Sequence, residues 1–361
     1  MKIRAFITHK KAEHFKDCQD RFSVNSGTKS VAVSDGMSQS YQQKIWAELL
    51  VSSFTSNIEW VPNHASVKEL FPLWLDGVRM FIQKLKDANA PQYLVIMNEN
   101  ALAQRKSAGA TFCGIRFKGD DWSGDVLGDS CLIELKKGRI QKIYTSQQGG
   151  EFDNHPDYFD SNSLSEGKGT PLEIRGTLDR NSVVLLVSDP LSDFLNEKMK
   201  LGLEETYVKE LLCLNSHTEF EELVENWRDN LKMHNDDTTL IIIEYDGKDE
   251  FNVECCDDLS SLIAQEENCD MEQNNLHEQE EQTSDDSLDD IAVEVESGIE
   301  DVDFSDYIVS VEDFVRTGME QYEEIRSYQG NGIFSSHKDD EEILQDTLRA
   351  LYNLYSDKFN A

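Results

Sequence analysis

The chain lacks the features that mark membrane and exported proteins. No apolar run approaches the ~20 residues that a membrane span needs, and the N-terminal Met1-Lys2-Ile3-Arg4 is not followed by a signal-type apolar region. The seven cysteines are scattered without a Cys-x-x-Cys pair, which argues against a disulfide framework or a zinc site. We therefore expect a reduced, cytoplasmic protein with no membrane partner.

Basic residues are also scarce. Lysine and arginine number 34 against 70 aspartates and glutamates, which gives a net charge of −36. Nucleic-acid binding needs a basic surface, so no nucleic-acid partner is expected. The charge is uneven, because residues 251–361 contain 31 acidic residues and only 5 basic ones.

This asymmetry predicts three parts. Residues 1–250 contain the long apolar runs of a folded domain. Residues 251–304 are predicted to be an acidic, flexible linker, because so polar a stretch buries too little apolar surface to offset its chain entropy. Residues 305–361 regain a helical pattern and are expected to form a C-terminal helical segment, which packs on the first domain or faces a separate partner.

Apolar runs predict strands in the first domain, and apolar residues at helical spacing predict helices. The expected strands are residues 2–8, 31–35, 110–117, 125–130, 131–135, 140–144, 183–189 and 240–243. The expected helices are residues 42–54, 67–85, 194–212 and 218–231, with a further helix favoured in the second half of 92–106. Residues 146–170 are polar and are predicted to form a long loop.

Four acidic residues lie next to predicted strands although they are far apart in the sequence: Asp20, Asp35, Asp189 and Asp236. If they converge, a cluster of buried carboxylates needs cations to offset the cost of burial. Ligands that are only hard oxygens select Mg²⁺ or Mn²⁺ over Zn²⁺ or Cu²⁺. Two such ions can activate a water molecule and clamp a phosphate, but composition and periodicity alone do not show that the acids meet.

Six short motifs carry a family resemblance, and they stand in the family's order. They are His9-Lys10-Lys11 with Cys18-Gln19-Asp20, Val31 to Gly36, Gly109-Ala110-Thr111, Gly128-Asp129-Ser130, Ser188-Asp189-Pro190-Leu191, and Asp236-Asp237-Thr238-Thr239. Over roughly residues 5–245 the chain resembles the protein phosphatase 2C family, the metal-dependent serine/threonine phosphatases, and looks closest to its bacterial branch.

The resemblance implies an α+β fold, a four-layer α-β-β-α sandwich of two antiparallel sheets flanked by helices, with residues 1–250 as the catalytic domain. It implies two ions, Mn²⁺ or Mg²⁺. Asp35 would bridge both, Gly36 would offer its backbone carbonyl, Asp189 and Asp236 would hold the first, and Asp20 would support the site directly or through water. Asp35 and Asp20 would thus be the catalytic residues.

The implied reaction is attack of a metal-bridging hydroxide on a phosphoserine or phosphothreonine. The implied partners are a phosphorylated protein substrate and an opposing serine/threonine kinase, which would place the protein in signalling.

Several positions depart from the family's pattern. Gln19 stands where many members have a metal-binding glutamate, Met37 replaces a histidine proposed as a general acid, and Pro190 replaces a small residue. An acid expected after the hairpin is not evident at Ser146-Gln147-Gln148. These departures motivate an alternative, a catalytically weak or inactive phosphatase-like module that binds or regulates a partner. The enzyme is favoured because all four acids are present.

Two further assignments stay open. The phosphate-binding base has four candidates: Lys10, Lys11, Lys16 and Arg21. Asp129 is interpreted as a structural turn acid rather than as a ligand.

Overall fold

The computed structural model describes residues 1–146, 156–162, 167–257 and 259–266, all of them within the first of two units, Met1–Gln282. Its larger sheet has six strands in the order β13-β1-β12-β11-β7-β8. These strands are β1 (Lys2–Thr8), β7 (Cys131–Lys136), β8 (Arg139–Tyr144), β11 (Val183–Val187), β12 (Thr238–Glu244) and β13 (Asn252–Cys256). All neighbours are antiparallel except β1 and β13, which run parallel.

The second sheet has five antiparallel strands in the order β10-β6-β5-β3-β2. They are β2 (Arg21–Asn25), β3 (Ser30–Ser34), β5 (Phe112–Lys118), β6 (Asp121–Leu127) and β10 (Leu172–Thr177). A short pair, β4 (Gly109–Ala110) and β9 (Phe159–Asp160), adds a third small sheet.

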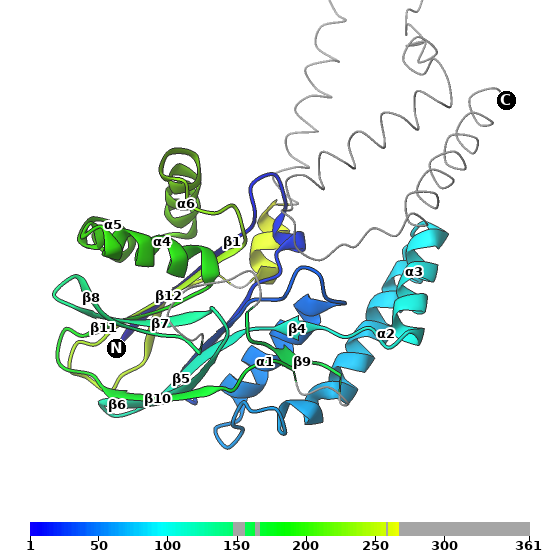
Figure 1. Cartoon of the computed structure of the whole chain (residues 1–361), viewed down its shortest axis with the longest axis horizontal. Helices are drawn as coiled ribbons and strands as arrows, with labels where there is room; N and C mark the ends of the chain where they lie inside the picture. The colour runs from blue at the N-terminus through cyan, green and yellow to red at the C-terminus, as the bar shows by residue number, and fades with distance from the viewer. Residues whose placement is uncertain (147–155, 163–166, 258, 267–361) are drawn as a thin grey trace, which may run out of the picture. The chain divides into compact units, whose positions relative to one another are not determined.

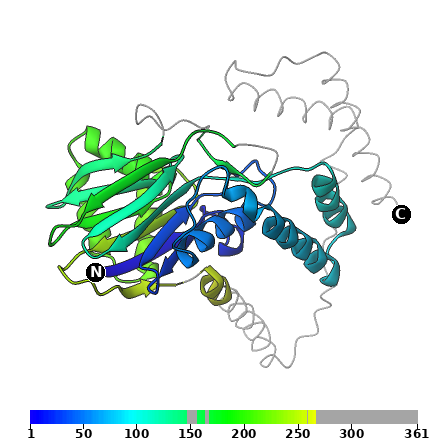
Figure 2. The ribbon, with the colours of Figure 1, turned by 90° about the horizontal axis from the view of Figure 1, so that it is seen from below.

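Strand periodicity explains the layers, because successive side chains point to opposite faces of a sheet. Val31 and Val33 of β3 pack with Ile241 and Ile243 of β12 in the core between the sheets. Ala32, on the opposite face of β3, packs against helices on the outer side of the five-stranded sheet. This outer layer comprises α1 (Gln43–Ser56), α2 (Phe71–Asp87) and α3 (Gln92–Ala103), of which α2 and α3 lie side by side (Figure 2).

The outer face of the six-stranded sheet is covered in the same way. Leu185 and Val187 of β11 pack there with Leu195 and Val208 of the helices. These helices are α4 (Asp189–Lys200), α5 (Glu204–Leu212) and α6 (His217–Leu231) (Figure 1). The predicted four-layer α-β-β-α sandwich is therefore confirmed, with one parallel strand pair added. No helix in the described ranges is long and apolar enough to cross a membrane.

The helix favoured in the second half of 92–106 is α3, which already begins at Gln92. Three other predicted boundaries need correction. The helix expected at 194–212 is two helices, because Gly202 has a φ of +69° between α4 and α5. The strand expected to end at Asp189 ends at Val187, and α4 starts at Asp189 with Pro190 in its first turn, where proline fits.

The third boundary is the start of the acidic linker, set at residue 251. Residues 252–256 instead form β13 on the edge of the larger sheet, and residues 259–266 are helical. The remaining predicted linker, 267–304, and the predicted helical segment 305–361 lie outside the described residues.

Candidate metal centre

Loops from distant parts of the chain meet at one end of the six-stranded sheet, where its strands begin or end. Thr8 pairs with Thr238, so β1 ends where β12 begins. Val187 pairs with both Leu240 and Cys131, so β11 also ends there and β7 begins there. The segments that carry Lys10, Asp129, Asp189 and Asp236 all lie next to strand ends at this end of the sheet.

The five-stranded sheet contributes the other two predicted acids. Arg21 of β2 pairs with Ser34 of β3, so Asp20 directly precedes one strand and Asp35 directly follows its antiparallel neighbour. The two sheets pack face to face through their shared core. As a result, the acids of both sheets reach a common site.

The electrostatics of the four acids show that they interact. Burial, followed by Asp35, raises the pKa of Asp20 well above its usual range. Burial, followed by Asp236, raises the pKa of Asp35 to about 7. Burial and then Asp35 also raise the pKa of Asp189 strongly, with smaller effects of Asp20 and Asp236. Like charges have such effects only at close range, so the structure brings the four predicted acids together.

A fifth acid joins them. Asp129 is only 5% exposed, and burial followed by Asp35 raises its pKa to about 8. The interpretation of Asp129 as a turn acid rather than a ligand stays a prediction, but sequence reasoning did not place it in the cluster. The available signal was the Gly128-Asp129-Ser130 motif before β7, but the pairing of β7 with β11 is not readable from the sequence.

Motif residues hold Asp35 in place from the backbone. The Thr111 N–H donates to the Asp35 carbonyl over 2.9 Å, and the Asp35 N–H donates to Thr111 Oγ1 over 3.2 Å. Thr111 Oγ1 is also hydrogen-bonded to Ser130 Oγ at 2.7 Å. Two motifs that seemed separate thus form one support behind the carboxylate.

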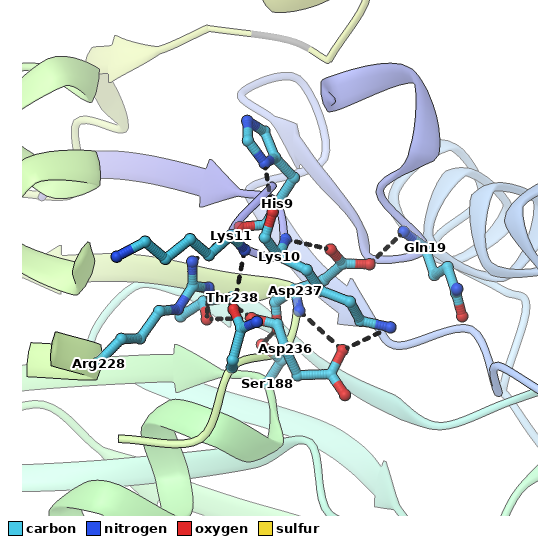
Figure 3. Close-up of polar contacts among 10 residues, drawn as sticks. His9, Lys10, Lys11, Gln19, Ser188, Arg228, Asp236, Asp237 and Thr238 are labelled. Atoms are coloured by element: carbon cyan, nitrogen blue, oxygen red, sulfur yellow. Dashed lines mark hydrogen bonds and ion pairs between the residues drawn. The ribbon is translucent and has the colours of Figure 1, made fainter. Parts of the chain in front are cut away.

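Asp20 and the loop before it have their own supports. Thr239 Oγ1 donates to Asp20 Oδ2 over 2.7 Å, and the Thr239 N–H donates to Ser188 Oγ over 2.9 Å. Asp237 accepts hydrogen bonds from the backbone N–H groups of Lys10 (3.0 Å) and Gln19 (2.6 Å) (Figure 3). Both Asp237 oxygens therefore brace the loop.

Gly36 occupies a place where no side chain fits. A Cβ there would lie 2.9 Å from Gln43 Cγ and 3.0 Å from the Gln19 carbonyl oxygen. Glycine is required for this close approach, and it leaves the backbone beside Asp35 uncovered by a side chain.

Comparison with known families agrees with this geometry. A family model described as protein phosphatase 2C matches residues 11–231, more than half of the chain. The chain belongs to the protein phosphatase 2C family. It is thus a protein phosphatase by family, a hydrolase of phosphate esters.

The chain is also similar to several solved structures. A bacterial serine phosphatase is 14% identical, with a TM-score of 0.43 over 68% of this chain and 98% of that one. The S. agalactiae serine/threonine phosphatase is 13% identical, with a TM-score of 0.43 over 67% and 98%. The catalytic domain of the serine threonine protein phosphatase PstP in complex with two manganese ions is 15% identical, with a TM-score of 0.40 over 68% and 98%. A search of curated proteins found no match.

The side chains of this phosphatase 2C member fit a hard divalent cation in donor type and charge. Among the described residues, Asp20 Oδ1, Asp129 Oδ1 and Gln19 Oε1 are buried without a hydrogen-bond partner. Leaving such an oxygen unsatisfied costs about 1–3 kcal/mol, or more when it is charged. A cation bound among them would supply the missing partner and would offset the repulsion between the carboxylates.

Cation binding nevertheless requires side chains to move. Within the described part of the chain, no three His, Cys, Asp or Glu side chains are grouped to hold a metal ion as they stand. One obstacle is visible, because Lys10 Nζ lies 3.0 Å from Asp236 Oδ1 and forms an ion pair with it (Figure 3). Burial lowers the pKa of Lys10, but the hydrogen bond and attraction to Asp236 raise it overall.

The partners of the candidate phosphate-binding bases distinguish Lys10 from the other three. The Lys10 ammonium forms an ion pair with Asp236, one of the predicted site acids, whereas Lys11 pairs with Asp229 on the surface at 2.6 Å. Arg21 donates to the backbone carbonyl of Cys18 over 2.9 Å, and Lys16 is exposed on the surface. Lys10 is therefore the candidate that the geometry favours.

Gln19→Glu is expected to tighten Mn²⁺ binding by about tenfold, because a carboxylate adds a charged oxygen where a neutral amide oxygen stands. Isothermal titration calorimetry of the full chain with Mn²⁺ measures this change. Gln92→Glu, at an exposed position in the first turn of α3, adds the same charge away from the acid cluster and serves as the matched control. Equal Mn²⁺ affinity for Gln19→Glu and the unmodified protein would contradict the prediction.

Proposed function

We propose that this protein is a divalent-cation-dependent serine/threonine protein phosphatase. The observation that carries the proposal is the convergence of Asp20, Asp35, Asp189 and Asp236 from four loops, with buried carboxylate oxygen left unpaired. So costly a cluster is typical of a functional site rather than of a stabilising core.

The ligands in this proposal are those that the motifs predict. Asp35, the Gly36 carbonyl, Asp189 and Asp236 would hold two Mn²⁺ or Mg²⁺ ions, with Asp20 in support. When bound, the ions would lower the pKa of a water molecule so that hydroxide is the nucleophile, and would clamp the phosphate oxygens for displacement.

Other residues of the chain would position the carboxylates and the phosphate. Thr111 holds the backbone of Asp35 at both its N–H and its carbonyl, so the carboxylate leaves a fixed point. Thr239 fixes one oxygen of Asp20 and leaves the other free for a cation or its water. With Asp236 held by a cation, the Lys10 ammonium would be available to bind a phosphate oxygen as a point charge.

The direct test is hydrolysis by the full chain. With millimolar Mn²⁺ we expect release of phosphate from phosphothreonine and phosphoserine peptides and from p-nitrophenyl phosphate, and loss of that release with EDTA. A phosphotyrosine peptide tests the substrate class. A folded, Mn²⁺-loaded sample without turnover of any phosphopeptide would overturn the proposal.

The second candidate is a binding or regulatory module that has kept the fold. The Lys10–Asp236 ion pair favours it, because an internal ammonium can replace a cation as the counter-charge. This candidate predicts that a phosphopeptide binds without being hydrolysed and that calorimetry detects no Mn²⁺ binding. Binding of two Mn²⁺ ions would exclude it.

Lys10→Gln is expected to tighten Mn²⁺ binding about threefold and to raise KM for a phosphopeptide about tenfold. The reason is that the change removes both the competitor on Asp236 and the charge for the phosphate. Calorimetry and steady-state kinetics measure the two effects. Lys11→Gln, which breaks only the exposed ion pair with Asp229, should leave both values unchanged. Weaker Mn²⁺ binding by Lys10→Gln would contradict the assignment.

The proposed substrate is a phosphorylated protein, so the proposal includes an opposing serine/threonine kinase and a signalling role in the cytoplasm. Phosphoproteomics of a deletion strain would identify the substrate, as phosphosites whose occupancy rises.

A further inference from the structure

A short helix after β13 covers the outside of the loop that enters the metal centre. Residues 259–266, here named the C-terminal clip, are helical and lie beside the first loop of the chain (Figure 1). Leu262 is 3% exposed and packs with Ile7, Phe15 and Cys18. Leu259 and Ile263 pack against the same cluster from its edge.

The clip also makes polar contacts with residues 9–20, here named the site loop. Glu266 Oε2 accepts a hydrogen bond from the backbone N–H of Phe15 over 3.0 Å. Glu266 Oε1 lies 2.9 Å from His14 Nδ1 and 3.9 Å from His9 Nε2. One carboxylate thus joins three residues of the site loop, and the contact spans about 250 positions in the sequence.

The site loop is therefore held from two sides. From within, Asp237 accepts from the N–H groups of Lys10 and Gln19. From outside, Leu262 and Glu266 hold its middle. The loop carries Lys10, Gln19 and Asp20, so a change in its path would move three residues of the centre at once.

The clip lies beyond residues 11–231, the part of the chain that the family model matches. It belongs to a small cluster at the edge of the domain, separate from the three large clusters that hold the sheets and helices together. Loss of its contacts is therefore expected to release the site loop locally rather than to unfold the domain.

We propose that residues 259–266 form a clip that holds the site loop in the conformation seen here, which places Gln19 and Asp20 at the acid cluster, with Leu262 and Glu266 as positioning residues. The functional consequence rests on the proposed phosphatase activity, but the effect on the loop does not. The clip is the last described segment before residues 267–361, so it links the start of the C-terminal extension to the metal centre.

The experiment uses the full chain with Glu266→Gln or Leu262→Ala. Hydrogen–deuterium exchange of the cation-free protein should show at least tenfold faster exchange in residues 9–20, with little change in β11 and β12. Calorimetry should show Mn²⁺ binding weakened about three- to tenfold. Glu222→Gln, an exposed acid on α6, is the charge-matched control, and Leu262→Met, which conserves volume, should retain protection.

Unchanged exchange in the site loop would overturn the proposal, and so would exchange that rises equally across both sheets. His14→Ala combined with Glu266→Gln provides a further check, because residues that act through one contact give less than additive effects. Since exchange is read without cation or substrate, failure of the phosphatase assay alone would overturn only the proposed function.

The clip also determines which deletion can test a role of the acidic residues after Glu266 in the activity. A deletion from residue 257 onward would remove Leu262 and Glu266 together with the extension and would disturb the site loop. A deletion that begins after Glu266 keeps the clip. A rise in activity in that second deletion would then report an inhibitory role of the acidic extension alone.

Discussion

Asp35→Asn is expected to lower Mn²⁺-dependent kcat/KM toward p-nitrophenyl phosphate by at least about 10³-fold. Asp35 interacts with Asp20, Asp189 and Asp236, and in the proposed site it would be a ligand of both ions. Asparagine keeps the shape but removes the charge, and a loss of several kcal/mol in transition-state stabilisation corresponds to this factor. Steady-state kinetics with saturating Mn²⁺ measure the effect.

The same variant should not lose stability without cations. Burial, followed by Asp236, raises the pKa of Asp35 to about 7, so its ionised form is disfavoured in the folded state. At pH 8 the neutral amide removes this penalty, and the cation-free variant is expected to melt at or above the temperature of the unmodified protein. Low activity with an intact melting transition separates a catalytic role from misfolding.

Asp125→Asn is the matched control. Asp125 is a partly buried acid on β6, and burial followed by Glu173 raises its pKa to about 6. It shares the environment of a disfavoured carboxylate but lies in another part of the sheet. The activity of the Asp125→Asn variant should stay within about twofold of that of the unmodified protein. An Asp35→Asn enzyme that keeps more than a tenth of its activity would contradict the bridging role.

Local patterns predicted much of this fold, because the decisive signals are contained in short windows. The continuous apolar runs of 183–187 and 240–243 indicated strands buried on both faces, and both are central strands. The motif around Gly109-Ala110-Thr111 indicated a strand start, and its threonine proves to support Asp35.

Long-range pairing was not predictable in the same way. Asp129 joins the acids only because β7 lies beside β11, a register that no local pattern encodes. The parallel addition of β13 to β1 follows from contacts across about 250 residues, so the acidic composition beyond residue 250 suggested a linker instead. The contact of Glu266 with Phe15 was hidden for the same reason.

Divalent cations are expected to stabilise the protein strongly at pH 8 and weakly at pH 5.5. Folding raises the pKa of Asp35 to about 7 and of Asp129 to about 8, so the folded state binds more protons than the unfolded state between about pH 4 and 8. Stability of the cation-free protein therefore falls as the pH rises through this range. Cations compete with those protons for the same carboxylates, so they bind most tightly at a pH at which the carboxylates are deprotonated.

The expected size follows from mass action. At 100 times its Kd, one bound ion stabilises the folded state by about 2.7 kcal/mol. In a domain of about 250 residues, each kcal/mol shifts Tm by about 2–4 °C, so one ion gives roughly 5–10 °C at pH 8. Differential scanning fluorimetry with Mn²⁺ or EDTA at both pH values measures the shift, and Asp35→Asn should reduce it.

The comparison with and without Mn²⁺ isolates the metal centre from other titrating groups. Burial, followed by Glu197, raises the pKa of Asp193 to about 6, and Asp125 behaves similarly, so both contribute to the pH dependence of the cation-free protein. Their contributions are present with and without Mn²⁺ and cancel in the difference. A Tm shift by Mn²⁺ that is as large at pH 5.5 as at pH 8 would therefore show that the ion binds away from the cluster of Asp35 and Asp129.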